Sequence, residues 1–65
     1  MFHRLYAKSP GDKRYSPMDY NAGHQVINLM FATLFSPEET QRLEAELPKL
    51  HKENPGWKFM IRKAS

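Results

Sequence analysis

The chain has 65 residues, with ten Lys and Arg against seven Asp and Glu, so its formal net charge is +3. This length allows a single domain over residues 1–65, and about 60% of the unfolded surface is buried in a domain of this size, so we expect low stability. Because there is no cysteine, disulfides and thiolate metal sites are excluded. The positive charge permits an acidic partner, nucleic acid included, but is also ordinary for a small domain.

No segment of the sequence has the pattern of a targeting or membrane-spanning element. The first eight residues lack the long apolar run of a signal peptide. The most apolar stretch, residues 26–35, has only ten residues and includes Asn28 and Thr33, whereas a helix needs about 20 to span a bilayer. We therefore expect a cytoplasmic protein with no membrane partner.

The first 16 residues predict a β-hairpin. Residues 2–8 alternate, with Leu5 and Ala7 on one side and polar or aromatic residues on the other. Ser9-Pro10-Gly11-Asp12 has proline and glycine where a type II turn needs them. Residues 13–16 would return as the second strand, which we expect Pro17 to end because proline cannot donate to a ladder.

Residues 17–35 carry conflicting patterns. Asp19 or Asn21 could cap a short helix, although Gly23 weakens it by about 1 kcal/mol. The residues that follow fit both a helical stripe and a strand. A capped helix that begins after Ser36 requires non-helical backbone just before it, so we predict one or two helical turns near 22–27 and a buried strand over about 29–35.

The clearest element is a helix that begins after Ser36. Serine suits the N-cap, Pro37 suits the first helical position, and Glu39 can complete a capping box with Ser36. Glu46 lies four residues after Arg42 and can pair with it.

One face of this helix is apolar and its end is marked. Leu43, Leu47 and Leu50 lie on the same side. Pro48 removes a hydrogen bond to Glu44, so we expect helix to about residue 47 and a bent continuation to about 53. Asn54-Pro55-Gly56 stops the helix.

The last segment, residues 57–62, alternates as a strand. Trp57, Phe59 and Ile61 would point inward, and Lys58, Met60 and Arg62 outward. The whole pattern predicts an α+β fold: a three- or four-stranded sheet, made of the hairpin, the central strand and the C-terminal strand, with the main helix on one face. A strand, a helix and a strand joined by short turns also favour a parallel, right-handed crossover.

A family resemblance supports this setting. The segments that carry it are Tyr6-Ala7-Lys8, Asn28-Leu29, Ala32-Thr33-Leu34-Phe35 and Asn54-Pro55-Gly56-Trp57-Lys58-Phe59. Together they resemble small uncharacterised proteins of bacteria and of their phages or mobile elements. The resemblance implies a bacterial, cytoplasmic setting and carries no known activity.

The sequence offers no motif for catalysis, a cofactor or a metal. His3, His24 and His51 have no metal-ligand spacing and lie on three different predicted elements. The serines lack a nucleophile motif, and the three glycines are isolated and make no phosphate-binding loop. We therefore predict a protein that is not an enzyme, with no catalytic residue, metal or cofactor.

The outward face of the predicted sheet is the candidate binding face. Cations alternate there with aromatic or apolar side chains, and the predicted set is Phe2, Arg4, Tyr6, Lys8, Arg14, Lys58, Met60 and Arg62. Single-stranded nucleic acid is bound in this way, with phosphates on Lys and Arg and bases stacked on rings. A solvated sheet face, with Lys and Arg stems lying over exposed rings, explains the same pattern.

The third interpretation of this face is a protein interface, because aromatic residues, Met and Arg are enriched at such interfaces. Self-association would also stabilise a small fold. Our prediction is therefore a non-enzymatic cytoplasmic interaction module, a bacterial or phage accessory protein with a protein partner. The alternative is a single-stranded nucleic-acid-binding module.

Overall fold

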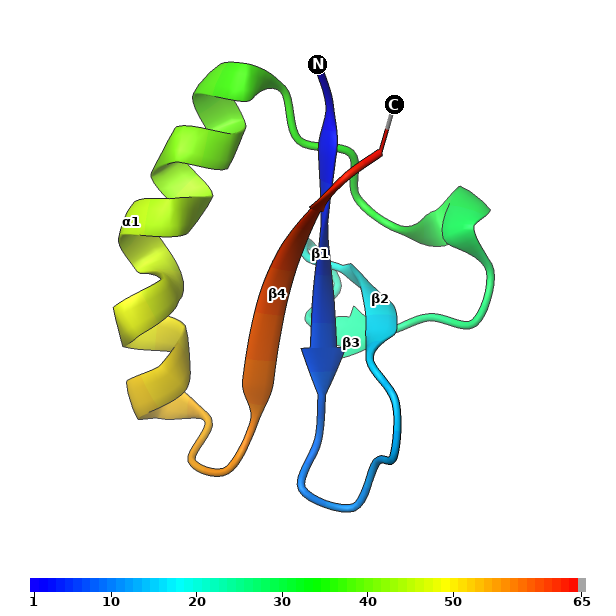
Figure 1. The fold of residues 1–65 in the computed structure, drawn as a ribbon, viewed down its shortest axis with the longest axis vertical. Helices are drawn as coiled ribbons and strands as arrows, with labels where there is room; N and C mark the ends of the chain where they lie inside the picture. Colours follow the sequence, from blue (N-terminus) through cyan, green and yellow to red (C-terminus); the bar gives the residue numbers. More distant parts are fainter. Residues whose placement is uncertain (65) are drawn as a thin grey trace.

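The computed structural model describes residues 1–64 as a four-stranded antiparallel sheet with one long helix (Figure 1). The elements are β1 (His3–Lys8), β2 (Ser16–Asp19), β3 (His24–Gln25), the 3-10 helix η1 (Leu29–Phe31), α1 (Pro37–Glu53) and β4 (Lys58–Lys63). The strand order is β3-β2-β1-β4. The predicted α+β fold is confirmed. No helix within residues 1–64 is long and apolar enough to cross a membrane.

The two longest strands, β1 and β4, lie side by side in the sheet. On the inner face their register places apolar residues opposite each other, such as Leu5 opposite Ile61 and Ala7 opposite Phe59. On the outer face it pairs cations with cations and Tyr6 with Met60. Leu5 and Ala7 are fully buried, as their alternation predicted. The core is completed by Met18, Phe35 and Leu43, with Tyr20, Leu47, Leu50, Trp57, Phe59 and Ile61 packed around it.

Helix α1 begins as predicted. The Ser36 hydroxyl accepts a hydrogen bond from the Glu39 amide at 3.2 Å, and the Glu39 carboxylate accepts one from the Ser36 amide at 3.0 Å, which completes the capping box. These bonds from Ser36 lower the pKa of the Glu39 carboxyl, because they favour its charged form.

Pro48 does not divide the helix, which runs through it to Glu53. The helix ends near residue 53, as predicted, and is continuous at Pro48. Glu44 and Pro48 are both exposed, so water can reach this side of the helix, where the Glu44 carbonyl lacks its usual donor. Leu43 faces the core, with Leu47 and Leu50 packed against it, as the stripe predicted.

The segment between β1 and α1 differs most from the prediction. The second strand of the hairpin is Ser16–Asp19 and contains Pro17, which we expected to end it. The Pro17 carbonyl accepts from Val26, towards β3. The N–H and C=O groups of one residue in an antiparallel strand point the same way. The N–H that proline lacks would therefore also face β3. Since β3 has only two residues, the missing donor does not end β2.

The predicted helix near 22–27 and the predicted central strand over 29–35 are both wrong. A turn leads into β3, and η1 follows, with Asn28 as its N-cap. In this stretch Phe35 forms a single β-bridge, to His3, with hydrogen bonds of 3.0 and 2.8 Å, and the Thr33 amide donates one further bond to Met18. The predicted parallel crossover is also wrong, because without a central strand β4 pairs directly with β1, antiparallel.

Candidate binding face

The outer face of β1 and β4 brings like charges opposite each other. Across the two strands Arg4 is opposite Arg62 and Lys8 is opposite Lys58. Between these two pairs lies Tyr6 opposite Met60. Like charges directly opposite one another reduce the stability of a sheet. The outer face is therefore arranged as two cationic pairs with an aromatic and thioether pair between them.

Two of the cations lie over aromatic rings. The Arg62 guanidinium carbon is 5.3 Å from the centroid of the Tyr6 ring, and the Lys8 ammonium is 5.9 Å from that of Tyr15. Both distances lie within the range of a cation–π interaction, which is worth about 0.5–1 kcal/mol at exposed sites. The rings thus orient the charged groups along the face as well as offering stacking surfaces.

Arg4 has a feature that the other cations of the face lack. Its Nε is buried without a hydrogen-bond partner among residues 1–64. The residue opposite Arg4 on β4 is Arg62, whose guanidinium cannot accept a hydrogen bond. The Arg4 guanidinium is therefore a donor with unused capacity beside a second guanidinium.

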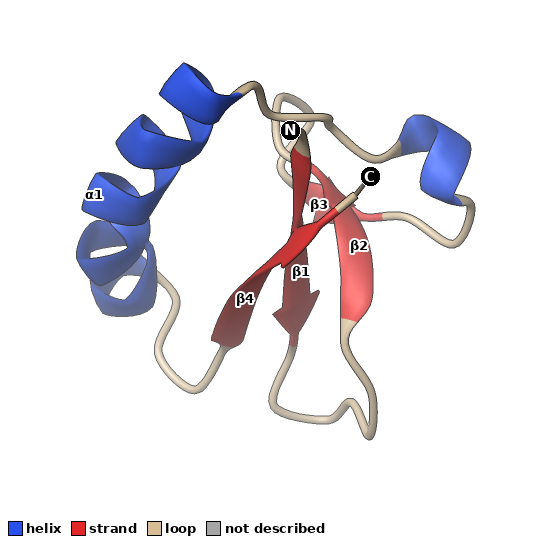
Figure 2. Cartoon of the chain, turned by 45° about the horizontal axis from the view of Figure 1, so that its top comes forward, coloured by secondary structure: helices blue, strands red, loops and turns tan. Residues whose placement is uncertain are grey.

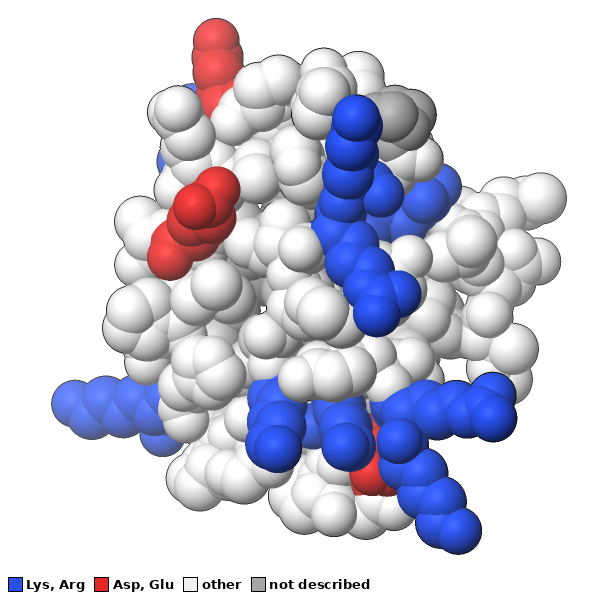
Figure 3. All heavy atoms as spheres, in the orientation of Figure 1, with Lys and Arg blue, Asp and Glu red and all other residues white. Residues whose placement is uncertain are grey.

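The surface view shows how charge is distributed (Figure 3). Lys and Arg side chains gather over β1 and β4 and around the end of the sheet where β1 ends and β4 begins, whereas Asp and Glu lie mainly on the α1 side. This separation makes the outer face electropositive.

The structure places six of the eight residues predicted for this face on β1 and β4, and the other two outside these strands. The strand members predicted to share it are brought together on adjacent strands: Arg4, Tyr6, Lys8, Lys58, Met60 and Arg62. Phe2 precedes β1 and is half exposed, with its carbonyl bonded to the Ala64 amide at 2.7 Å. Arg14 is exposed in the loop between β1 and β2, outside the ladder.

Sequence reasoning missed two residues of the face. Tyr15 provides the ring under Lys8, and Pro17 lies opposite Tyr6 on β2. Both share one side of the returning strand, since they are two residues apart. The signal in the sequence was Tyr15, an aromatic residue two positions before Pro17. Whether Arg14 or Tyr15 lies on the outer face depends on the hairpin register.

A small hollow of about 180 Å³ lies at the end of the face where the two turns meet. It is lined by Lys8, Ser9, Pro10, Asp12, Gly56 and Lys58. Gly56 has φ +85°, and a Cβ there would lie 3.1 Å from the Pro10 side chain. Glycine therefore permits both the backbone conformation and the close approach of the turns, beside which Lys8 and Lys58 lie.

Asp12 is the acidic residue of this hollow, and its carboxylate is already engaged. It accepts hydrogen bonds from the Gln25 side chain at 2.9 Å and the Ser9 amide at 3.0 Å. These bonds, and the nearby Lys8, hold the pKa of Asp12 below its usual value. The carboxylate thus closes the β1–β2 turn.

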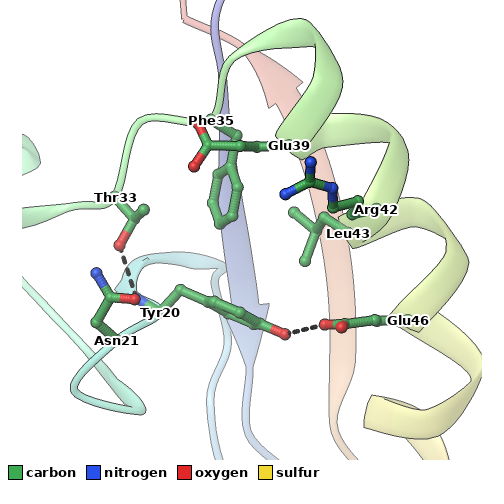
Figure 4. A pocket seen from close by; sticks show the side chains of 8 residues that line it. All are labelled: Tyr20, Asn21, Thr33, Phe35, Glu39, Arg42, Leu43 and Glu46. Atoms are coloured by element: carbon green, nitrogen blue, oxygen red, sulfur yellow. Dashed lines mark hydrogen bonds between the residues drawn. The ribbon is translucent and has the colours of Figure 1, made fainter.

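A second cleft, of about 240 Å³, lies between α1 and the turn after β2 (Figure 4). Here the Tyr20 hydroxyl donates to the Glu46 carboxylate at 2.5 Å, so Glu46 has a different partner from the predicted Arg42. This bond raises the pKa of Tyr20 to about 12, and a phenol with so high a pKa is a poor proton donor near neutrality. The arrangement ties the turn to the helix.

The three histidines lie on three different elements, β1, β3 and α1. His3 lies near Thr40, with Nδ1 3.5 Å from its hydroxyl; His24 contacts the Gln25 carbonyl; and the His51 ring meets the edge of Phe59. Within residues 1–64 no group of three His, Asp or Glu side chains could hold a metal ion.

Comparison with known proteins adds no relative. No family model, curated protein or solved structure matches the chain.

Proposed function

We propose that this chain is a non-enzymatic interaction module that binds single-stranded nucleic acid on the outer face of its sheet. The observation that carries the proposal is the pairing of Arg4 with Arg62 and of Lys8 with Lys58. Such pairs reduce stability in the free protein. A phosphate between the two members of a pair replaces their repulsion with two attractive contacts, so the arrangement favours an anionic ligand.

The spacing of the two cationic pairs favours a polymer over a small anion. The two pairs are four positions apart along each strand, which corresponds to about 13 Å between Cα atoms. Successive phosphates of one strand can contact both pairs at this backbone spacing. Tyr6 lies between the pairs and Tyr15 beside Lys8, where bases of the same strand can stack, a contact worth about 1–3 kcal/mol per base.

A protein partner is the second candidate for the same face. Tyr6, Met60 and the two arginines have the composition that is enriched at protein interfaces. The role of a cytoplasmic accessory protein of a bacterium or phage, which the resemblance implies, is compatible with either ligand. The two candidates differ in their response to salt, because counterion release makes nucleic-acid binding weaken steeply as salt rises, whereas contact through Tyr6 and Met60 changes little.

The test is titration of a labelled single-stranded oligonucleotide at two salt concentrations. Lys58→Ala with Arg62→Ala should weaken binding and flatten its dependence on salt, because fewer counterions are released. Lys49→Ala with Lys52→Ala removes the same charge from exposed sites on α1 and should retain most of the affinity. Tyr6→Ala should weaken binding with a smaller change in slope.

Two outcomes contradict the proposal. No binding by the wild type at low salt would remove nucleic acid as the ligand and leave the protein partner. Equal losses in the two double variants would mean that net charge, and not the outer face, determines binding.

A further inference from the structure

An uncharged stretch projects from the side of the molecule opposite α1 (Figures 1 and 2). Residues 26–35 contain no Asp, Glu, Lys, Arg or His. Most of their large apolar side chains lie in solvent: Ile27 is fully exposed, Met30 is 80% exposed, Phe31 is 62% exposed, and Leu29 and Leu34 are about half exposed. We call these five residues the apolar patch.

The area of the patch is comparable to that of the largest apolar patch on a typical monomer. Taking roughly 150 Å² for each large apolar residue when fully exposed, the five together expose on the order of 500 Å². This is within the range of the largest patch on a typical monomer, about 300–600 Å², which is often functional. Two such patches in complete contact would remove about 1,000 Å² in total, the area that a biological interface should reach.

The patch is held in a fixed arrangement by backbone hydrogen bonds at both ends. At one end the Val26 amide donates to Pro17 at 2.8 Å, and at the other the Thr33 amide donates to Met18 at 3.0 Å. Between them Asn28 caps η1, accepting from the Met30 amide at 2.9 Å. A surface that is ordered before binding loses less entropy when it binds.

We propose that two copies of this chain associate through the apolar patch, in an isologous contact. Such a contact requires a patch that is complementary to itself, and a surface of apolar side chains without charge meets that requirement. Each chain carries a net charge of +3, but the five residues of the patch contribute none of it.

Sedimentation equilibrium of the full chain over a wide range of concentration tests the proposal. The wild type should approach twice the monomer mass as concentration rises. Met30→Glu should weaken association at least tenfold, because it places a charge in an apolar contact. Gln41→Glu, at an exposed position on α1, adds the same charge and should associate as the wild type does. A wild type that stays monomeric, or equal association by the Met30 and Gln41 variants, would overturn the proposal.

A second variant separates association from folding. Ile27 is fully exposed, so Ile27→Ser removes no core contact. It should weaken association, and its melting temperature should equal that of the wild type at concentrations where both are monomeric. Binding of the wild-type monomer to lipid vesicles without self-association would assign the patch to a membrane surface and reject the second copy. Met30→Glu should keep its affinity for oligonucleotide, because the patch includes no residue of the outer face; the two proposals can therefore fail separately.

Discussion

The inner and outer faces of the β1–β4 pair use one hydrogen-bonded ladder for opposite purposes. On the inner face Leu5 and Ala7 are fully buried opposite Ile61 and Phe59. On the outer face the same ladder places cations opposite cations, an arrangement that reduces stability. The difference teaches that the inner face stabilises the pairing of the two strands, whereas the like charges of the outer face oppose it.

The largest contrast should appear when each face is truncated. Leu5→Ala should lower the free energy of unfolding by about 2–5 kcal/mol, because it leaves a cavity in the centre of the core. A chain of this length has roughly 3–10 kcal/mol in total, so much of the variant should be unfolded. Lys58→Ala, at an exposed site of the outer face, should stay within about 0.5 kcal/mol. Urea denaturation measures both, and similar losses would contradict the division between the faces.

The sequence predicted these two faces well because the signals are local. A period of two along residues 3–8 and 58–63 determines which side chains share a side, whichever strands pair. The start of α1 was equally predictable, because Ser36 and Glu39 make a capping box within four residues. Six of the eight predicted members of the binding face follow from the strand alternation alone.

The segment between β1 and α1 could not be predicted, because its structure depends on tertiary contacts. An apolar run indicates burial, but Met30 and Phe31 are exposed, and only Ala32 and Phe35 of residues 26–35 are buried. Asn28 uses its side chain to cap η1, and such local bonds compete with strand pairing. Tyr15 was missed for a similar reason, since the register of a hairpin depends on its loop.

A substitution in the turn before β4 tests the contact between this turn and the turn that joins β1 to β2. Gly56→Ala places a side chain at φ +85° and 3.1 Å from Pro10. Gly23→Ala has φ +77° but no atom within 4 Å of the new Cβ, so it measures the backbone cost alone, about 1–2 kcal/mol. Gly56→Ala should cost more than Gly23→Ala by thermal denaturation. Gly11→Ala, with neither constraint, should be close to neutral; an equal effect at Gly56 and Gly23 would mean that the contact with Pro10 is unimportant.

The smallest expected change in stability gives the sharpest test of the outer face. Lys58→Glu converts a like-charged pair with Lys8 into an opposite-charged pair and should raise the free energy of unfolding by about 0.2–1 kcal/mol. The same substitution should abolish most oligonucleotide binding, because it removes one cation and neutralises a second. Lys63→Glu makes the same change in net charge on the same strand, but Lys63 pairs with His3 on the inner-face side of the register, so its stability and binding should change little.

Thermal denaturation and the oligonucleotide titration, run on both variants, measure the two effects. A protein that becomes more stable as it loses its ligand would show that the repulsion between Lys8 and Lys58 is maintained for binding. Loss of stability in Lys58→Glu, or equal loss of binding in both variants, would show that the pairing across the outer face has no such role.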